Sequence, residues 1–266
     1  MSGETIRIAG ASGFWGDAAR STPQLLKDED VDFIVYDYLA EITMSIMARA
    51  RAKNPDNGYA LDFVSAVMKP NLTEIARQSV RIISNAGGVN PRACADALRG
   101  VIAELNLDLK VACVLGDDMI GQRDEIAAQG HKEMFSGDGF PDVSKVASIN
   151  AYLGAFPVAR ALQEGADIVI TGRSVDSSVT LGACIDAFGW GRGDLNQLAM
   201  GSLAGHILEC GPQATGGNFT DWELSNNLEN IGYPVAEIRQ DGSFLCSKPK
   251  GTGGLVSVGT IAEQMV

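Results

Sequence analysis

Residues 167–173, Asp-Ile-Val-Ile-Thr-Gly-Arg, contain a short β-branched run that stops abruptly at a glycine. Such a run suits a strand buried on both faces, because the strands of parallel sheets are continuously apolar rather than alternating. Segments with helical spacing of apolar residues lie on either side of it, at 152–165 and 176–188. The stretch therefore predicts one strand of a parallel sheet, flanked by helices.

The same arrangement recurs four times in the N-terminal part of the chain. Apolar runs that end in Gly, Asp or Asn occupy residues 5–9, 31–36, 81–84 and 110–115. Helices are predicted between them, opening at Thr22-Pro23 and spanning 41–53, 61–79 and 91–105. The last of these follows Asn90 and Pro91, a favourable N-cap and first-turn pair. Regular alternation of strand and helix predicts an α/β fold, a Rossmann-like parallel sheet with helices on both faces.

The pattern changes near residue 190. A helix through His206 is followed by glycine-rich loops, and Gln240-Asp-Gly242 between two short apolar runs is a hairpin signal. We therefore predict one α/β domain over 1–266, with the sheet core in 1–190 and a helix, Gly-rich loops and a small hairpin region in 191–266. The chain stops at Val266 without a cap or tail, and we expect it to continue in a longer protein. Residues 131–148, rich in Gly, Asp and Ser, are predicted to form a loop that could act as a lid.

Composition narrows the classes of partner. The formal charge is −12, from 21 basic and 33 acidic residues, which argues against a nucleic-acid partner because such binding needs a basic footprint. An anionic ligand must instead be held by local donors. No apolar stretch is long enough to span a membrane, and no signal peptide is visible. The five scattered cysteines form no C-x-x-C pair and indicate reduced thiols, so we expect a cytoplasmic protein.

Ligands of open parallel sheets bind beyond the carboxyl ends of the strands, and the first such end here is a glycine-rich loop. It has the form Gly10-x-x-Gly13-x-x-Gly16, which is neither the dinucleotide fingerprint nor a P-loop. Asp17 places a negative charge there, which argues against a phosphate. Gly13, Trp15 and Asp17 are candidate ligand contacts; the alternative is a tight turn in which Trp15 only packs.

Carboxylates and amides follow the next three predicted strands. They are Asp37, Asn85 with Gly87 and Gly88 behind it, and the pair Asp117 and Asp118. Oxygen ligands converging at one end of the sheet could hold Mg²⁺, with Asp37, Asp117 and Asp118 as its ligands. They could equally act as acid and base, or be ordinary N-caps of the helices that follow.

Arg173 ends the fifth strand, close to Asp176, and both residues are candidate ligand contacts. An arginine beside a helix N-terminus suits a carboxylate or phosphate, and the alternative is a salt bridge to Asp176 or Asp117. On the ligand-binding hypothesis, Arg173→Lys is expected to leave the melting temperature within a few degrees and to weaken binding at least tenfold.

His206 and Cys210 share one face of a helix and could be a nucleophile pair or half of a zinc site, although a structural histidine is an alternative. Together with Asp117 and Asp118, His206 completes the predicted catalytic set. The turn at 248–254, with Lys248 and Lys250, could bind an anion or be a plain turn.

Several segments, taken together, resemble the acyclic terpene utilization (AtuA) family. They are Ala11-Ser-Gly-Phe-Trp-Gly-Asp17, Asp37-Tyr-Leu-Ala-Glu-Ile-Thr43, Ser84-Asn-Ala-Gly-Gly88, Asn150-Ala-Tyr-Leu-Gly-Ala155, Gly165-Ala-Asp-Ile-Val-Ile-Thr-Gly-Arg173, Ala204-Gly-His-Ile-Leu-Glu-Cys-Gly211, Thr215-Gly-Gly-Asn-Phe-Thr-Asp-Trp222 and Lys248-Pro-Lys-Gly-Thr-Gly-Gly254. Each segment alone is weak, but they occur in order over nearly the whole chain.

The resemblance implies a role in the catabolism of acyclic terpenoid or branched acids handled as CoA thioesters, with cleavage of a branched 3-hydroxyglutaryl-CoA as one suggested reaction. It supplies no established catalytic residues. We therefore expect an enzyme acting on a CoA-linked branched acid by lyase or hydrolase chemistry, with Mg²⁺ as its candidate cofactor and a homo-oligomeric assembly. The alternative is a non-catalytic ligand-binding or assembly subunit of a catabolic complex.

Overall fold

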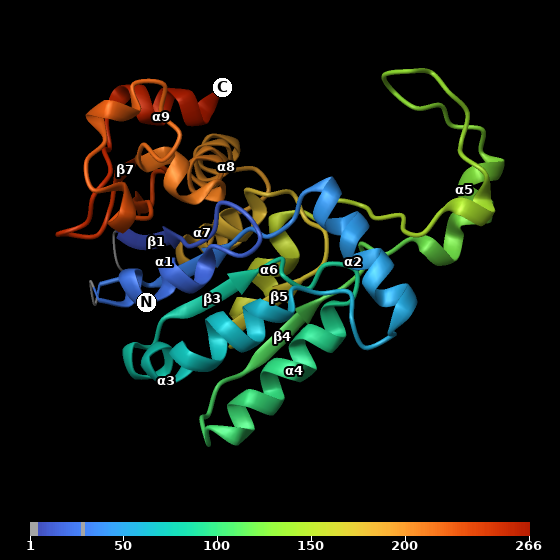
Figure 1. Ribbon diagram of the computed structural model, residues 1–266, viewed down its shortest axis with the longest axis horizontal. Helices are drawn as coiled ribbons and strands as arrows, with labels where there is room; N and C mark the ends of the chain where they lie inside the picture. The colour runs from blue at the N-terminus through green and yellow to red at the C-terminus, as the bar shows by residue number, and fades with distance from the viewer. Residues whose placement is uncertain (1–4, 28–29) are drawn as a thin grey trace.

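The computed structural model describes residues 5–27 and 30–266 (Figure 1). Its described part contains a seven-stranded sheet in the order β4-β5-β3-β2-β1-β6-β7. The strands are β1 (Thr5–Gly10), β2 (Phe33–Tyr36), β3 (Arg81–Ser84), β4 (Val111–Val114), β5 (Ile168–Thr171), β6 (Val235–Arg239) and β7 (Phe244–Ser247). All five predicted parallel strands are present, and β1 to β5 pair in parallel. The predicted α/β class is confirmed.

The strand order differs from that of the dinucleotide-binding sheet, because β5 inserts between β3 and β4. The chain moves in one direction from β1 through β3 to β4 and then turns back to β5. Right-handed crossovers therefore place the connecting helices of the two directions on opposite faces. Accordingly, Leu25, Leu72 and Leu98 join the core on one face, while Val158 and Ala183 join the core on the other.

The predicted helices are present at the expected places in the chain, but some of them begin at other residues than predicted. The longer ones are α1 (Ala18–Leu26), α2 (Glu41–Lys53), α3 (Lys69–Gln78), α4 (Pro91–Glu104), α6 (Ala155–Gln163), α7 (Ser178–Phe188), α8 (Leu195–Glu209) and α9 (Val258–Met265). A π-helical segment, η1 (Phe63–Met68), runs directly into α3.

Two predicted helix starts are wrong. Helix α1 begins at Ala18, so Pro23 lies inside it; the hydroxyls of Ser21 and Thr22 both donate to the Ala18 carbonyl and hold the turn before the proline. Helix α6 begins only at Ala155 rather than at residue 152, because Leu153 forms a parallel bridge with Ser174. That bridge keeps the chain at the carboxyl end of β5.

The predicted hairpin is confirmed as β6 and β7, which pair antiparallel on either side of the 240–242 turn. Gly242 has a φ of +89°, a conformation that glycine adopts without steric cost. Strand β6 also pairs antiparallel with β1, so the hairpin extends the main sheet rather than forming a region apart from it.

The segment after β4 forms an arm that projects from the body of the molecule (Figure 1). It contains α5 (Arg123–Ala128) and the predicted loop at 131–148. Met134 and Phe135, in the turn closed by the bridge between Lys132 and Gly139, are 84% and 88% exposed. The outer part of the loop projects away from the sheet and does not cover it as a closed lid would (Figure 1). Its inner end, from Pro141 to Ser148, lines a cavity with α2 and Arg173.

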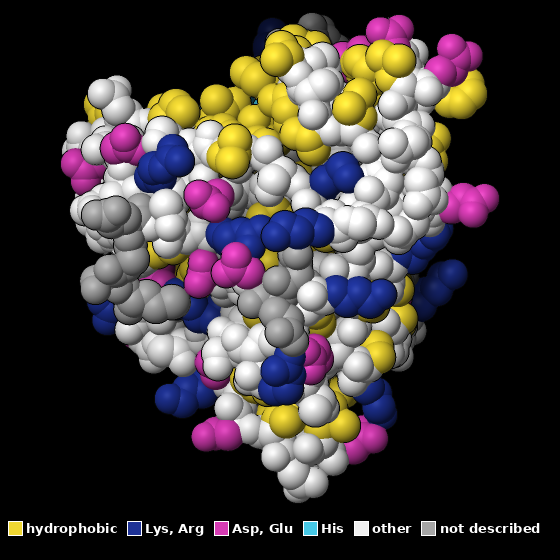
Figure 2. Space-filling model, turned by 90° about the vertical axis from the view of Figure 1, so that its left-hand side faces the viewer, with side chains coloured by type: hydrophobic (Ala, Val, Ile, Leu, Met, Phe, Trp, Pro, Cys, Tyr) yellow, Lys and Arg dark blue, Asp and Glu magenta, His cyan; other side chains and the backbone are white. Residues whose placement is uncertain are grey.

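Apolar side chains are also exposed on the C-terminal part of the molecule. Figure 2 shows them gathered along the upper part of the face on the left of Figure 1. The exposed ones from this part of the chain include Trp222, Leu224, Leu245 and Val258. Among the described helices, none is both long enough and apolar enough to cross a bilayer.

The start of α4 provides a test of the local sequence analysis. The Asn90 side chain accepts a hydrogen bond from the Ala93 amide at 3.4 Å, as an N-cap should, and donates to the carbonyls of Pro55 and Asn57, each at 2.9 Å. We expect Asn90→Ala to lower the free energy of unfolding by about 1–2 kcal/mol, measured by urea denaturation. A value indistinguishable from wild type would show that neither the cap nor the loop contacts contribute.

Candidate active site at the carboxyl end of the sheet

The polar residues that follow the parallel strands meet at one end of the sheet. Asn85, after β3, donates from its side chain to Asp37, after β2. Arg173, after β5, donates from its backbone amide to the Asp117 carboxylate at 2.8 Å, and from Nη1 to the Leu39 carbonyl at 3.2 Å. These contacts link the ends of four neighbouring strands, as parallel pairing requires.

A cluster of three carboxylates forms part of this end, and only two of its members were singled out from the sequence. Oxygens of Asp37, Asp176 and Glu209 all lie within 4.8 Å of one another. Arg173 Nη1 contacts Asp176 Oδ1 at 2.5 Å, and His206 Nδ1 contacts Glu209 Oε1 at 2.8 Å. We call Asp37, Asp176 and Glu209 the acidic cluster, and Arg173 and His206 are its two neighbours. Glu209 was missed, although it lies three positions after His206 on a predicted helix.

One carboxyl of the cluster, that of Asp37, holds its proton up to about neutral pH. Burial, with the nearby Asp176 as a smaller cause, raises the pKa of Asp37 to about 7. Burial also raises the pKa of Glu209, an effect that His206 opposes. Carboxyl groups that titrate near the working pH are suited to general acid and base catalysis. These three carboxylates are also the described residues placed to ligate a hard cation.

Asp117 and Asp118 do not join that cluster, so the predicted metal set of Asp37, Asp117 and Asp118 is not brought together. Asp117 is 2% exposed, and its Oδ2 accepts from both the Arg173 amide and the Asn150 side chain. Asp118 forms a salt bridge with Arg51 at 3.0 Å. The reason is the strand order: β5 lies between β3 and β4, which moves the residues after β4 away from Asp37. Asp117 thus positions the Arg173 loop.

The first glycine-rich loop is closed by its own residues. The Gly13 amide donates to Asp17 Oδ2 at 2.8 Å, and a β-carbon on Gly13 would lie 2.6 Å from the Cys210 carbonyl oxygen. Trp15 donates its indole N–H to Asp62 and packs on the core, which favours the packing interpretation over a stacking platform. Burial raises the pKa of Asp17 to about 6. Gly13 therefore permits the loop to approach the end of α8.

Gly87 and Gly88 also have packing reasons for lacking a side chain. A β-carbon on Gly87 would lie 2.4 Å from the Thr171 carbonyl oxygen, and Gly88 has a φ of +53° with the Met47 sulfur close by. These glycines let the turn after β3 fit against β5 and α2. Their predicted ligand contacts stay predictions.

The two remaining sequence hypotheses find less support. His206 pairs with Glu209 rather than Cys210, and burial together with Glu209, Asp37 and Asp176 raises the pKa of the Cys210 thiol, which disfavours the thiolate that a nucleophile needs. All five cysteines are free thiols. Lys248 donates to the Thr252 carbonyl at 2.9 Å. Its ammonium group is therefore bonded within the turn, which favours the plain turn over an anion site.

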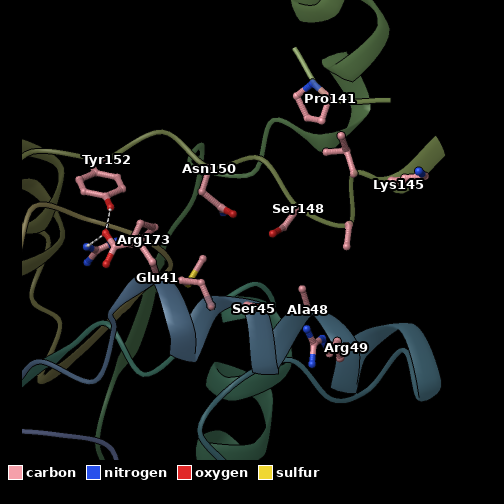
Figure 3. Close-up of a pocket in the computed structure, with 13 residues that line it drawn as sticks. Glu41, Ser45, Ala48, Arg49, Pro141, Lys145, Ser148, Asn150, Tyr152 and Arg173 are labelled. Atoms are coloured by element: carbon pink, nitrogen blue, oxygen red, sulfur yellow. Dashed lines mark hydrogen bonds and ion pairs between the residues drawn. The ribbon is translucent and has the colours of Figure 1, made fainter. Parts of the chain in front are cut away.

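A cavity of about 550 Å³ opens beside Arg173, between α2 and the inner end of the arm (Figure 3). Its walls include Met44, Ala48 and Val146. Glu41, Tyr152 and Arg173 lie at one end, and Arg49 and Lys145 lie toward the other (Figure 3). The volume falls within the usual range for small-molecule sites, roughly 300–1,000 Å³. Sequence patterns gave no sign of this cavity, because its walls come from segments far apart in the chain.

Comparison with known proteins identifies the family of this chain. Residues 6–266 match the model of the family described as acyclic terpene utilisation family protein AtuA. No curated protein and no solved structure was found to match the chain. Because the family model covers almost the entire sequence, the chain belongs to the AtuA acyclic terpene utilisation family.

Proposed function

We propose that this chain is an enzyme in the catabolism of acyclic terpenoid or branched-chain acids, acting on a CoA-linked branched acid by carbon–carbon lyase or hydrolase chemistry. One observation carries the proposal. A group of titratable side chains, Asp37, Asp176, Glu209 and His206, meets Arg173 at the carboxyl end of a parallel sheet. This end is where α/β sheets bind their ligands. Family membership supports the metabolic setting.

The acidic cluster can supply the proton transfers that either reaction needs. In a lyase step a base takes the proton of a hydroxyl, the adjacent carbon–carbon bond breaks to leave a carbonyl, and the departing carbanion is protonated. In a hydrolase step the base takes a proton from water, which attacks the thioester carbonyl, and the thiol leaves with a proton. Asp37, with a pKa of about 7, is suited to both the removal and the return of the proton.

The cavity complements such a substrate in shape and charge. Its apolar wall, with Met44, Ala48 and Val146, suits a branched hydrocarbon chain. Arg49 and Lys145 provide local positive charge in a protein whose formal charge is −12. Those two residues could contact the phosphates of a CoA moiety at the cavity's outer end.

The test is a thermal-shift screen of straight and branched acyl-CoA thioesters, with and without Mg²⁺, followed by assays of CoA release and of carbon-chain cleavage. Branched thioesters are expected to stabilise the protein and to turn over, and Asp37→Asn is expected to reduce turnover at least a hundredfold. Glu223→Gln, a change at an exposed glutamate on the C-terminal part of the chain, is the matched control. Absence of stabilisation by any acyl-CoA would overturn the substrate class.

The rival function is a non-catalytic ligand-binding or assembly subunit of a catabolic complex, which would also suit a homo-oligomer. The exposed Met134 and Phe135 on the projecting arm favour it, since exposed apolar residues mark interaction surfaces. The same screen separates the two functions. Stabilisation by a thioester without turnover, in wild type and Asp37→Asn alike, would support the binding subunit.

A further inference from the structure

The inner end of the cavity already holds a carboxylate, and it belongs to the protein. Glu41, the first residue of α2, accepts a hydrogen bond from the Tyr152 hydroxyl at 2.6 Å, and its carboxylate lies 3.7 Å from Arg173 Nη2. Figure 3 shows Glu41 next to both residues. The Tyr152 hydrogen bond and the Glu41 backbone amide lower the pKa of this carboxyl, with Arg173 as a smaller cause.

Arg173 is built to receive an anion along one of its edges. Its Nη1 is fully used, by the carbonyls of Leu39 and Ser174 and by Asp176. Its Nε is buried and has no hydrogen-bond partner among the described residues, although the side chain as a whole is only 3% exposed. Nε and Nη2 form the side of a guanidinium that binds a carboxylate with two parallel hydrogen bonds. That side is only loosely engaged, by Glu41 at 3.7 Å.

Tyr152 fixes the plane of this arginine. Its ring lies over the Arg173 guanidinium, 4.0 Å from ring centroid to Cζ, while its hydroxyl points at Glu41. The bridge between Leu153 and Ser174 holds the two segments together. One aromatic residue thus orients the cation and also donates to the anion that the cation attracts.

Glu41 itself is held by little else. Its side chain is 82% exposed, so no packing fixes it in place. The start of α2 adds the positive end of a 13-residue helix. The Glu41 side chain can therefore move from Arg173 and Tyr152 into water at a small cost in free energy. A ligand carboxylate can then accept the hydrogen bond of Tyr152 and contact Arg173 in its place.

We infer that Arg173, Tyr152 and the first turn of α2 form a carboxylate-binding subsite, and that Glu41 occupies this subsite as an internal competitor in the unliganded protein. The ligand class is a carboxylate with a short branched apolar stem, since Met44 and Ala48 of α2 line the adjacent wall. This inference rests on the proposed function for its metabolic setting only. The binding behaviour follows from the contacts alone.

The competition has a calculable effect. A site available only a fraction of the time binds its ligand more weakly by that fraction. If Glu41 occupies the subsite about nine-tenths of the time, its removal improves the affinity for a ligand carboxylate about tenfold. The gain must be confined to ligands that carry a negative charge at this position.

The probe is isovalerate, with isovaleramide as its uncharged isostere, titrated by calorimetry into wild type, into Glu41→Ala, and into Glu41→Ala combined with Tyr152→Phe or with Arg173→Lys. Glu41→Ala is expected to bind isovalerate about tenfold more tightly than wild type. Added to Glu41→Ala, either of the other changes is expected to remove most of that affinity. Glu223→Ala controls for the change in net charge, and isovaleramide controls for the apolar wall.

Each outcome bears on the subsite directly. Equal isovalerate affinities in wild type and Glu41→Ala, or no binding to either, would overturn the inference. A gain that is the same for isovaleramide would also overturn it, because Glu41 would then act sterically rather than as a competing anion. If Glu41→Ala gains affinity for isovalerate while no acyl-CoA is turned over, the subsite stands and the proposed enzymatic function fails.

Discussion

Asp37→Asn is expected to make the protein more stable at pH 8, by about 2–4 kcal/mol, and to change its stability little near pH 4. The physical reason is the carboxyl's pKa of about 7 in the folded protein, against an ordinary value of 3.8. Burial and the neighbouring Asp176 cause this rise. A carboxyl in such a place is a cost to folding whenever it is ionised.

The direction with pH follows from the proton balance. A carboxyl whose pKa is higher in the folded than in the unfolded state does not lower stability at low pH, where it is protonated in both states. As the pH rises between the two pKa values, only the folded state keeps the proton, and the free energy of unfolding falls. For Asp37 the loss runs from about pH 4 to about pH 7. Asparagine keeps an acceptor for the Asn85 side chain and the Leu39 amide and carries no proton to lose. The variant should therefore lack this part of the pH dependence.

Urea unfolding between pH 4 and pH 8 measures the effect. Wild type should lose stability over this interval faster than Asp37→Asn, and Asp221→Asn, a change at an exposed carboxylate, should follow wild type. Parallel curves for wild type and Asp37→Asn would mean that the pKa of Asp37 is the same in the folded and unfolded protein, so that the folded carboxyl is ionised at neutral pH. The proposal that it holds a proton for catalysis would then fail. A more stable but inactive variant is the signature of a site residue that costs stability.

The sheet could be predicted from the sequence because each strand has a recognisable local pattern of residues. Runs such as 81–84 are β-branched and end in a turn, and parallel pairing then places Asp37 and Asn85 at the same end. Spatial strand order is not a local property. Asp117 therefore looked equivalent to Asp37 along the chain, whereas the insertion of β5 separates them.

The rest of the candidate site depends on contacts between distant segments. Glu209 reaches Asp37 because α8 ends against the loop after β1, where Gly10 and Gly13 leave room for the Leu208 and Cys210 carbonyls. Glu41 and Tyr152 meet across 111 residues of sequence. These positions do not follow from periodicity or from a motif, because the segments that carry them make their contacts with parts of the chain that are far away in sequence.

Arg173→Met is expected to lower the free energy of unfolding by about 3 kcal/mol, since breaking a buried ion pair leaves its partners uncompensated. The arginine is 3% exposed, and it bonds Asp176 and the carbonyls of Leu39 and Ser174. Asp176 is 38% exposed and can regain water, which keeps the cost near the lower end of the usual range.

Arg173→Lys should cost roughly 1–2 kcal/mol, because an ammonium can satisfy only part of the same set of acceptors and loses the planar stacking on Tyr152. A loss of this size lowers the melting temperature by only a few degrees, at roughly 2–4 °C per kcal/mol in a domain of about this size, so the expectation from sequence stays a prediction. Urea denaturation of both variants, alongside Arg192→Lys as an arginine that also lies over an aromatic ring, measures the difference. If Arg173→Met unfolds at the wild-type urea concentration, the guanidinium does not hold the ends of β2 and β5 together. Its contacts would then serve the ligand alone, and the loss of carboxylate affinity in Arg173→Lys would be entirely a loss of recognition.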